Sequence, residues 1–351
     1  MIDVAIVGFA QAKSVRREDD YNEVEILMPV VDEAVRQSGI PRAEIGFTCS
    51  GSSDYIAGIP FSFVTALDGV GAWPPIQESH VEADGAWALY EAWTRLQHGD
   101  IDSALVYAFG KSSVGQLPDV LTRQLDPYLV APLWPDSISV AALQARAMID
   151  AGLTDERAMA EIAVRSRAAA KDNPNAQVTG DFDVDRLLGD EYISSPLRKH
   201  DCAPISDGAA AIVLATTERA RALAERPVWI RGIDHRIDAQ NLGVRDLARS
   251  PSSEAAATNA GVGADKIDVA EIYAPFTHQH ALLERALGIG AGTSVNPSGG
   301  ALAAHPLMAA GLIRIGETAA RIAGGSADRG LAHATQGPCL QQNLVCVLEG
   351  E

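Results

Sequence analysis

The chain has 351 residues, of which 47% are hydrophobic, 21% charged and 5% aromatic. Single hydrophobic cores stop growing at roughly 250–300 residues, so we expect two domains. The formal net charge of −18 argues against nucleic acid and anionic membranes as partners, because both require basic surface to neutralise phosphates. No basic leader opens the chain, no stretch approaches the ~20 apolar residues of a membrane span, and the four cysteines form no CxxC pair. We therefore expect a cytoplasmic protein with reduced cysteines and no metal site.

The first part of the chain alternates buried strands with amphipathic helices. Short apolar runs predict strands buried on both faces at residues 4–7, 103–108 and 209–215. Apolar residues at helical spacing predict helices near residues 23–37, 84–98 and 155–171. The region of about 115–200 is less regular, and its polar, turn-rich part 172–198 is expected to be a loop that covers the functional site.

After residue 226 the same pattern restarts. The later elements are a strand at 228–235, an apolar segment at 267–276, a Gly-rich turn, a helix over 305–324 and a final strand at 343–349. The chain therefore divides into two βα halves of similar plan, residues 1–222 and 223–351. There is no strict sequence repeat, so the duplication is a prediction about structure.

Four segments, in this order, resemble the thiolase superfamily and most closely its sterol-carrier-protein-like, lipid-transfer branch. They are ADGAWALYEAWTRLQHGDIDSALVYAFGKSS from Ala83, SSPLRKHDCAPISDGAAAIVLA from Ser194, EIYAPF from Glu271 and NPSGGALAAHP from Asn296. The last is the most specific, because NPxGG is followed by HP at the offset that the family uses. The resemblance covers essentially the whole chain and implies a thiolase-like α/β fold with αβαβα layers.

The departures from the family pattern carry more information than the matches. The catalytic cysteine of a thiolase stands three residues before the glycine that matches Gly85, and here that position is Glu82. A carboxylate cannot carry an acyl group as a thiolate does, so two-step thiolytic chemistry is predicted to be absent. Tyr273 stands where the family has an oxyanion-hole Asn or His, and a phenol can donate a hydrogen bond or accept a proton. Cys339 does not align securely with the family's acid–base cysteine, so that role is not carried over.

The resemblance assigns catalytic roles to His305 and Tyr273. It implies that His305 donates to the thioester carbonyl oxygen as negative charge builds there; the alternative is a histidine that fills a polar gap beside a turn. Tyr273 ends a strand and points, by resemblance, into the same cavity, whereas most tyrosines at such positions are only half-buried packing.

Two residues before the helix near 84–98 form a second candidate group. Glu82 is either a catalytic carboxylate or a favourable charge on the helix dipole, and His80 would share a strand face with it and pair with it. Asp84 is interpreted as the cap of that helix. His278 and His280 alternate as metal ligands can, but no third ligand is evident and a helix start or loop is favoured.

The resemblance also places the substrate. Asn296, Ser298, Gly299 and Gly300 of the NPSGG turn are predicted to line the thioester site, with the two glycines allowing the backbone to approach the pantetheine. No cofactor is implied, because the coenzyme A thioester is the substrate.

An oxyanion hole without a nucleophile suits a retro-aldol reaction. We expect a carbon–carbon lyase that cleaves a β-hydroxyacyl-CoA into a ketone and a short acyl-CoA, with Tyr273 as base or relay, His305 and a backbone N–H on the enolate oxygen, and Glu82 or His80 tuning or reprotonating. Lipid-transfer-like thiolases without the cysteine resemble the steroid side-chain aldolases of actinobacteria. A steroid side chain is therefore the expected substrate class.

Two other functions stay open at this point. One is a thiolase-type acyl-CoA acyltransferase that uses Cys339 or a water-based Claisen route, and the other is a non-catalytic subunit that binds acyl-CoA or lipid.

The resemblance further implies a homodimer, paired through the strand at 104–108, and a small partner with an OB fold and a zinc ribbon. The exact side chain, the partner's identity and the group that reprotonates the enolate do not follow from the sequence.

Overall fold

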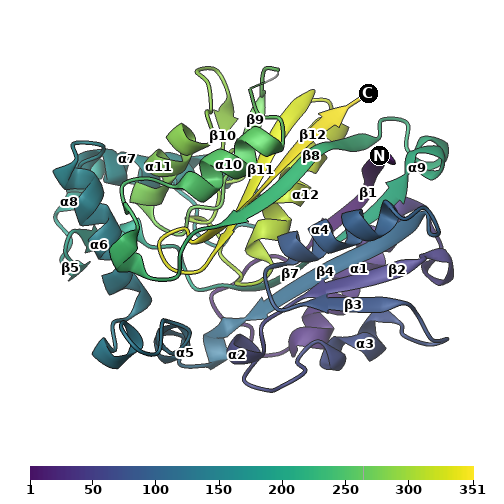
Figure 1. The fold of residues 1–351 in the computed structure, drawn as a ribbon, viewed down its shortest axis with the longest axis horizontal. Helices are drawn as coiled ribbons and strands as arrows, with labels where there is room; N and C mark the ends of the chain where they lie inside the picture. Colours follow the sequence, from purple (N-terminus) through teal and green to yellow (C-terminus); the bar gives the residue numbers. More distant parts are fainter. Residues whose placement is uncertain (264) are drawn as a thin grey trace.

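A ten-stranded mixed sheet runs through the whole molecule (Figure 1). The computed structural model describes residues 1–263 and 265–351. The strands follow the order β10-β9-β11-β12-β8-β1-β7-β4-β2-β3. Their bounds are β1 Val4–Gln11, β2 Phe47–Gly51, β3 Glu78–Val81, β4 Ser103–Lys111, β7 Asp207–Thr216, β8 Val228–Ile237, β9 Val269–Glu271, β10 Ser294–Val295, β11 Arg329–Gln336 and β12 Gln342–Gly350. A separate pair joins β5 Tyr192–Ser194 to β6 Leu197–Arg198.

The two ends of the chain build their strands in the same spatial order. In β1-β7-β4-β2-β3 the first strand lies beside the last, followed by the fourth, second and third, and β8-β12-β11-β9-β10 repeats this order. The two sets join through a short antiparallel contact between β1 and β8, where Ala5 pairs with Trp229 and Ile6 with Val228. The division into residues 1–222 and 223–351 stays a prediction, and the hydrogen bonds of the sheet cross it between β1 and β8.

Helices cover both sets of strands and also separate them. The helices are α1 Glu23–Ser38, α2 Asp54–Ala57, α3 Val64–Val70, α4 Gly85–Leu96, α5 Leu117–Arg123, α6 Ser137–Asp150, α7 Glu156–Ala169, α8 Val184–Leu188, α9 Thr217–Leu223, α10 Pro251–Asn259, α11 Thr277–Ala286 and α12 Ala310–Ala323. Side chains of α1 and α3 pack on the outer face of the first strand set, and those of α10 and α11 on the outer face of the second. Helices α4 and α12 lie between the two sets, which gives the expected αβαβα layers.

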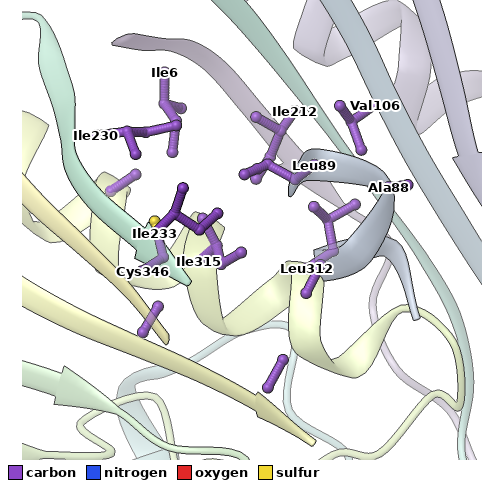
Figure 2. Close-up of a cluster of buried hydrophobic side chains, with 14 of the residues drawn as sticks. Ile6, Ala88, Leu89, Val106, Ile212, Ile230, Ile233, Leu312, Ile315 and Cys346 are labelled. Carbon is purple, nitrogen blue, oxygen red and sulfur yellow. The ribbon is translucent and has the colours of Figure 1, made fainter. Parts of the chain in front are cut away.

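The largest buried cluster lies around α4 and α12. Figure 2 shows Ala88 and Leu89 of α4 and Leu312 and Ile315 of α12 beside side chains from β1, β4, β7 and β8. All four of these helical residues are fully buried. Most residues of both central helices are buried, so residues at their N-termini are held in well-defined positions.

Two local predictions need correction. The segment expected to be a loop over 172–198 contains α8, β5 and β6, and the wider region 115–200 holds α5 and α6 besides α7, which was predicted near 155–171. The helix expected over 305–324 begins only at Ala310. Tertiary contacts explain this late start, because the backbone N–H of His305 donates to Ser206 Oγ (2.9 Å) and Met308 adopts a left-handed φ of 70°. Within the described part of the chain, no helix is long and apolar enough to cross a membrane.

Candidate active site

Tyr273 and His305 come from different segments and meet in a direct hydrogen bond. Tyr273 lies two residues beyond β9, and His305 lies in the turn that precedes α12. The Tyr273 hydroxyl is 2.6 Å from His305 Nε2, and the rings are edge-on with centroids 5.3 Å apart. Tyr273 is buried and His305 is partly exposed. The structure therefore brings together the two residues that the resemblance places in one cavity.

Both members of the pair are neutral near pH 7. Burial, with a smaller contribution from the negative charge of Asp84, raises the pKa of Tyr273 well above its usual value. Burial, with a smaller contribution from Arg314, lowers the pKa of His305 to about 4. The protonated phenol therefore donates its hydrogen bond to the unprotonated Nε2 of His305. The hydrogen bond provides a direct path along which a proton can pass between the phenol and the imidazole.

The backbone on either side of the pair is held by buried polar side chains. Asn296, with a left-handed φ of 47°, accepts the N–H of Ile272 at 2.6 Å and donates to its carbonyl at 3.1 Å. Ser206 accepts the N–H of His305. Asn296 thus fixes the backbone of the residue before Tyr273.

Ser298 belongs to a buried ionic network below the turn. Its hydroxyl donates to Glu271 (2.7 Å) and accepts from Arg314 (2.6 Å), which also donates to Glu271 at 2.7 Å. All three side chains are almost fully buried. The network connects the end of β9 to α12 and to the turn that leads to His305, so it positions both halves of the Tyr273–His305 pair.

Neighbouring atoms of the same chain leave no room for a side chain at Gly299 and Gly300. Both have left-handed φ angles, of 94° and 62°. A Cβ on Gly299 would lie 2.5 Å from the Cβ of Ala170, and a Cβ on Gly300 would clash with the amide of Asn296. Contact of Asn296, Ser298, Gly299 and Gly300 with a substrate stays a prediction.

Glu82 and His80 form a separate pair at the edge strand β3. His80 Nε2 is 3.5 Å from Glu82, its Nδ1 is 3.2 Å from Ser50 Oγ, and its ring stacks on Phe63. Glu82, which is exposed, accepts the backbone N–H of Asp54 at 2.7 Å. In the part of the chain that the structure describes, no hydrogen bond or ion pair connects Glu82 or His80 to Tyr273 or His305.

Asp84 is the polar residue of this region whose role the sequence analysis underestimated. It caps α4, as expected, by accepting the N–H of Ala86. Its carboxylate also accepts the N–H groups of Gly311 (2.9 Å) and Leu312 (3.1 Å), at the start of α12. Gly311 lies 227 residues from Asp84 in the chain. The one sequence signal for this second contact was a charged residue directly before a helix.

The cysteines and histidines outside this site do not supply an alternative centre. Cys339 is buried, its Sγ approaches the carbonyl of Val140, and burial raises its thiol pKa to about 12. His278 and His280 lie in α11, and burial lowers the pKa of His278 to about 3. Among residues 1–263 and 265–351, no group of three His, Cys, Asp or Glu side chains could hold a metal ion.

Two surface hollows lie elsewhere on the molecule. One, of about 430 Å³, is lined by residues of α1 and by Asp207, and the other, of about 560 Å³, is lined in part by Arg219. Neither is lined by Tyr273 or His305.

No protein-family model matches this chain. An acetyl-CoA acetyltransferase of Methanothermobacter thermautotrophicus is 28% identical, with 94% of this chain and 93% of the relative covered. Sterol carrier protein 2 of Gallus gallus is 22% identical over 97% of this chain and 69% of the relative. The 17-hydroxy-3-oxo-4-pregnene-20-carboxyl-CoA lyase of Mycobacterium tuberculosis is 27% identical over 64% of this chain and 61% of the relative. A solved Ltp2-ChsH2(DUF35) aldolase matches 99% of this chain and 97% of its own with a TM-score of 0.81 and 19% identity.

The chain has the layered thiolase fold. The proteins whose sequences it resembles include acetyl-CoA acetyltransferases, sterol carrier protein 2 and a carboxyl-CoA lyase.

Proposed function

We propose that this chain is a carbon–carbon lyase that cleaves a β-hydroxyacyl-CoA by a retro-aldol reaction. The observation that carries the proposal is the neutral Tyr273–His305 pair, in a thiolase-like fold that has Glu82 in place of the nucleophilic cysteine. A thiolase attacks a carbonyl through a thiolate, whereas this pair offers proton transfer. Retro-aldol cleavage needs a proton removed from a hydroxyl, and it needs no covalent bond to the enzyme.

The reaction runs through a two-residue proton relay. The Tyr273 oxygen takes the proton of the substrate's β-hydroxyl while the Tyr273 proton passes to His305 Nε2 over their 2.6 Å hydrogen bond. The electron pair of the O–H bond forms the C=O bond of the ketone, and the Cα–Cβ bond breaks to leave the enolate of a short acyl-CoA. The imidazolium of His305 is a positive charge next to the developing enolate and stabilises it. Return of the proton through Tyr273 to Cα regenerates both residues and balances the reaction.

This mechanism modifies two roles given by the resemblance. Because His305 Nε2 receives the Tyr273 proton, it acts on the enolate oxygen first through its charge. Glu82 and His80 hold the segment that begins with Asp54, through the hydrogen bond of Glu82 to the Asp54 N–H. We therefore propose that these two residues shape the entrance beside β3, and that reprotonation of the enolate is left to Tyr273.

The proposed substrate carries its hydroxyl on a tertiary carbon of a steroid side chain. Two observations support this class: a relative is a 17-hydroxy-3-oxo-4-pregnene-20-carboxyl-CoA lyase, and a solved structure with the same fold is an aldolase. A tertiary alcohol has no hydrogen on its carbinol carbon, so it cannot be oxidised to the β-ketoacyl-CoA that a thiolase cleaves, whereas retro-aldol cleavage converts it directly into a ketone.

The proposed assembly is a homodimer that works with a small OB-fold, zinc-ribbon protein. The structural neighbour pairs its aldolase with a DUF35 protein. A chain with a net charge of −18 gains from a partner that brings basic surface to the coenzyme A phosphates. The four free cysteines fit a reducing compartment, and we propose a cytoplasmic location.

A thiolase-type acyltransferase is the second candidate, because one relative that spans nearly the whole chain is an acetyl-CoA acetyltransferase. This reaction would need Cys339 as a nucleophile, but its thiol is buried beside the carbonyl of Val140. A non-catalytic acyl-CoA-binding subunit is the third. Both alternatives predict no cleavage in the absence of free coenzyme A.

The test incubates the purified chain with a β-hydroxyacyl-CoA that bears a tertiary alcohol, with and without a co-expressed OB-fold partner. The ketone and the short acyl-CoA are followed by mass spectrometry. We expect equal amounts of both products without added coenzyme A. A strict requirement for free coenzyme A would favour the acyltransferase, and binding of the thioester without cleavage in either preparation would favour the non-catalytic subunit.

A further inference from the structure

One short segment, residues 201–206, contacts the chain beside both members of the Tyr273–His305 pair. It has the sequence DCAPIS and leads directly into β7, which pairs with β1 on one side and with β4 on the other. Nearly every residue of β7 is buried. The 201–206 segment is therefore anchored at its end to a closely packed central strand.

The first half of this segment holds the chain that follows Tyr273. The backbone N–H of Ala203 donates to the carbonyl of Pro275 at 2.8 Å. The carboxylate of Asp201, which is 1% exposed, accepts the hydroxyl of Thr277 at 2.6 Å. The chain is thus fixed two and four residues beyond Tyr273.

The last residue of the segment, Ser206, holds His305. The backbone N–H of His305 donates to Ser206 Oγ at 2.9 Å, and the backbones of Ser206 and Pro306 lie side by side in a parallel bridge. Ser206 is fully buried. The same six residues therefore hold both of the chain segments whose side chains meet in the hydrogen bond between Tyr273 and His305.

The contact with Ser206 acts against the local preference of the chain. Proline is favoured at the first position of a helix, so the sequence at Pro306 suits a helix start directly after His305. Helix α12 begins instead at Ala310, and Met308 has a left-handed φ of 70°, which is unfavourable for a residue other than glycine. Contacts with the rest of the molecule must therefore hold this turn, and the hydrogen bond to Ser206 is one of them.

We propose that Ser206 is a positioning residue, which places the imidazole of His305 at hydrogen-bonding distance from the Tyr273 hydroxyl. It acts through the backbone of His305. The consequence for catalysis rests on the proposed function. Proton transfer over the 2.6 Å hydrogen bond is sensitive to small displacements, and a shift of about 1 Å can cost about 100-fold in rate.

The test observes the hydrogen bond itself and needs no substrate. The eight histidines are labelled with nitrogen-15 in their rings, and the Nε2 resonance of His305 is recorded by NMR, because its frequency depends on whether Nε2 accepts a hydrogen bond. His305→Gln assigns the resonance, and Tyr273→Phe gives its frequency without the hydrogen bond. In Ser206→Ala, the resonance should move toward the Tyr273→Phe frequency. An unchanged frequency in folded Ser206→Ala overturns the proposal.

Ser103→Ala is the matched control. Ser103 is also fully buried, and its hydroxyl also accepts a backbone N–H, that of Gly46 at 3.4 Å. It lies opposite Ala215, at the end of β7 that is remote from Ser206. The control should be less stable than the unmodified chain but leave the His305 resonance in place. Equal shifts in both variants would show a general effect of lost packing and would overturn the proposal.

Ser206→Cys is the second variant and decides the matter if Ser206→Ala does not fold. A thiol has nearly the shape of a hydroxyl but is a weaker hydrogen-bond acceptor. The His305 resonance should move in the same direction by a smaller amount, and an unchanged frequency would again overturn the proposal. The unmodified chain gives a further check, since a His305 frequency equal to that of Tyr273→Phe would leave no hydrogen bond for Ser206 to maintain.

Lyase kinetics separate this inference from the proposed function. If both hold, Ser206→Ala should lower kcat by about 10-fold or more with little change in KM. A resonance that moves in a chain without lyase activity would reject the proposed function and retain the positioning role. Full lyase activity of Ser206→Ala with an unchanged resonance would reject the positioning role and retain the proposed function.

Discussion

At the scale of single residues, the proposed chemistry depends on Tyr273 and His305, and both can be recognised from the sequence. The position of Tyr273 in EIYAPF and of His305 in AAHP was enough to predict that both belong to one site, because each stands in a motif with a known place in the fold. Their mutual hydrogen bond, and therefore the relay, could not be predicted, because it depends on the orientation of both rings. Glu82 was placed among the catalytic candidates by its position alone, and in the structure it accepts the N–H of Asp54.

The relay predicts the effect of removing a single oxygen. Tyr273→Phe should fold normally and lower kcat for retro-aldol cleavage by about 100-fold or more, with little change in KM, as for loss of a general acid–base group. The measurement is steady-state formation of the ketone. The matched control is Tyr128→Phe, since Tyr128 is largely exposed, and it should keep full activity. Equal activity of Tyr273→Phe and the unmodified chain would exclude the relay.

At the scale of elements, buried ionic contacts determine how β9 and α12 meet. The hydrophobic pattern predicted these elements, but the start of α12 was predicted five residues too early, because no local signal shows that His305 is drawn toward Ser206. The same holds for the double cap by Asp84, whose second helix is distant in the chain. Local pattern fixes which residues are helical, and contacts between the halves decide where the helix can begin.

The network of Arg314 offers a test at this scale. Arg314→Met keeps the length of the side chain but leaves Glu271 as an unpaired buried charge, which should reduce the free energy of unfolding by about 3–5 kcal/mol. Urea denaturation followed by circular dichroism measures it. Arg36→Met removes an exposed ion pair with Glu33 and should leave the free energy of unfolding nearly unchanged. A loss for Arg314→Met as small as for the control would mean that the network does not hold β9 against α12.

At the scale of the whole molecule, several buried histidines make stability depend on pH. Burial lowers the pKa of His278 to about 3 and the pKa values of His305 and His333 to about 4. At these three positions the unfolded chain therefore binds more protons than the folded one between about pH 4 and pH 6.5. This contribution to stability is fully present above pH 6.5 and is lost as the pH falls toward 4, by up to about 1.4 kcal/mol per pH unit for each group.

His333→Gln should make this acid slope shallower, since it removes one of these histidines from a site remote in the chain from the relay residues. Urea midpoints measured at several pH values from 7 to 5 give the slope. His98→Gln, at an exposed position, should leave the slope unchanged. A slope for His333→Gln equal to that of the unmodified chain would show that His333 does not stay neutral in the folded protein.

The central claim is that carbon–carbon cleavage proceeds without an acyl-enzyme, and intact-protein mass spectrometry during a single turnover tests it most directly. The chain is mixed with less than one equivalent of a β-hydroxyacyl-CoA, without free coenzyme A, in heavy water. We predict ketone and short acyl-CoA in equal amounts, one deuterium on the α-carbon of the acyl-CoA, and no acyl adduct on the protein at any time. A protein mass increased by an acyl group, or cleavage that begins only when free coenzyme A is added, would contradict the account.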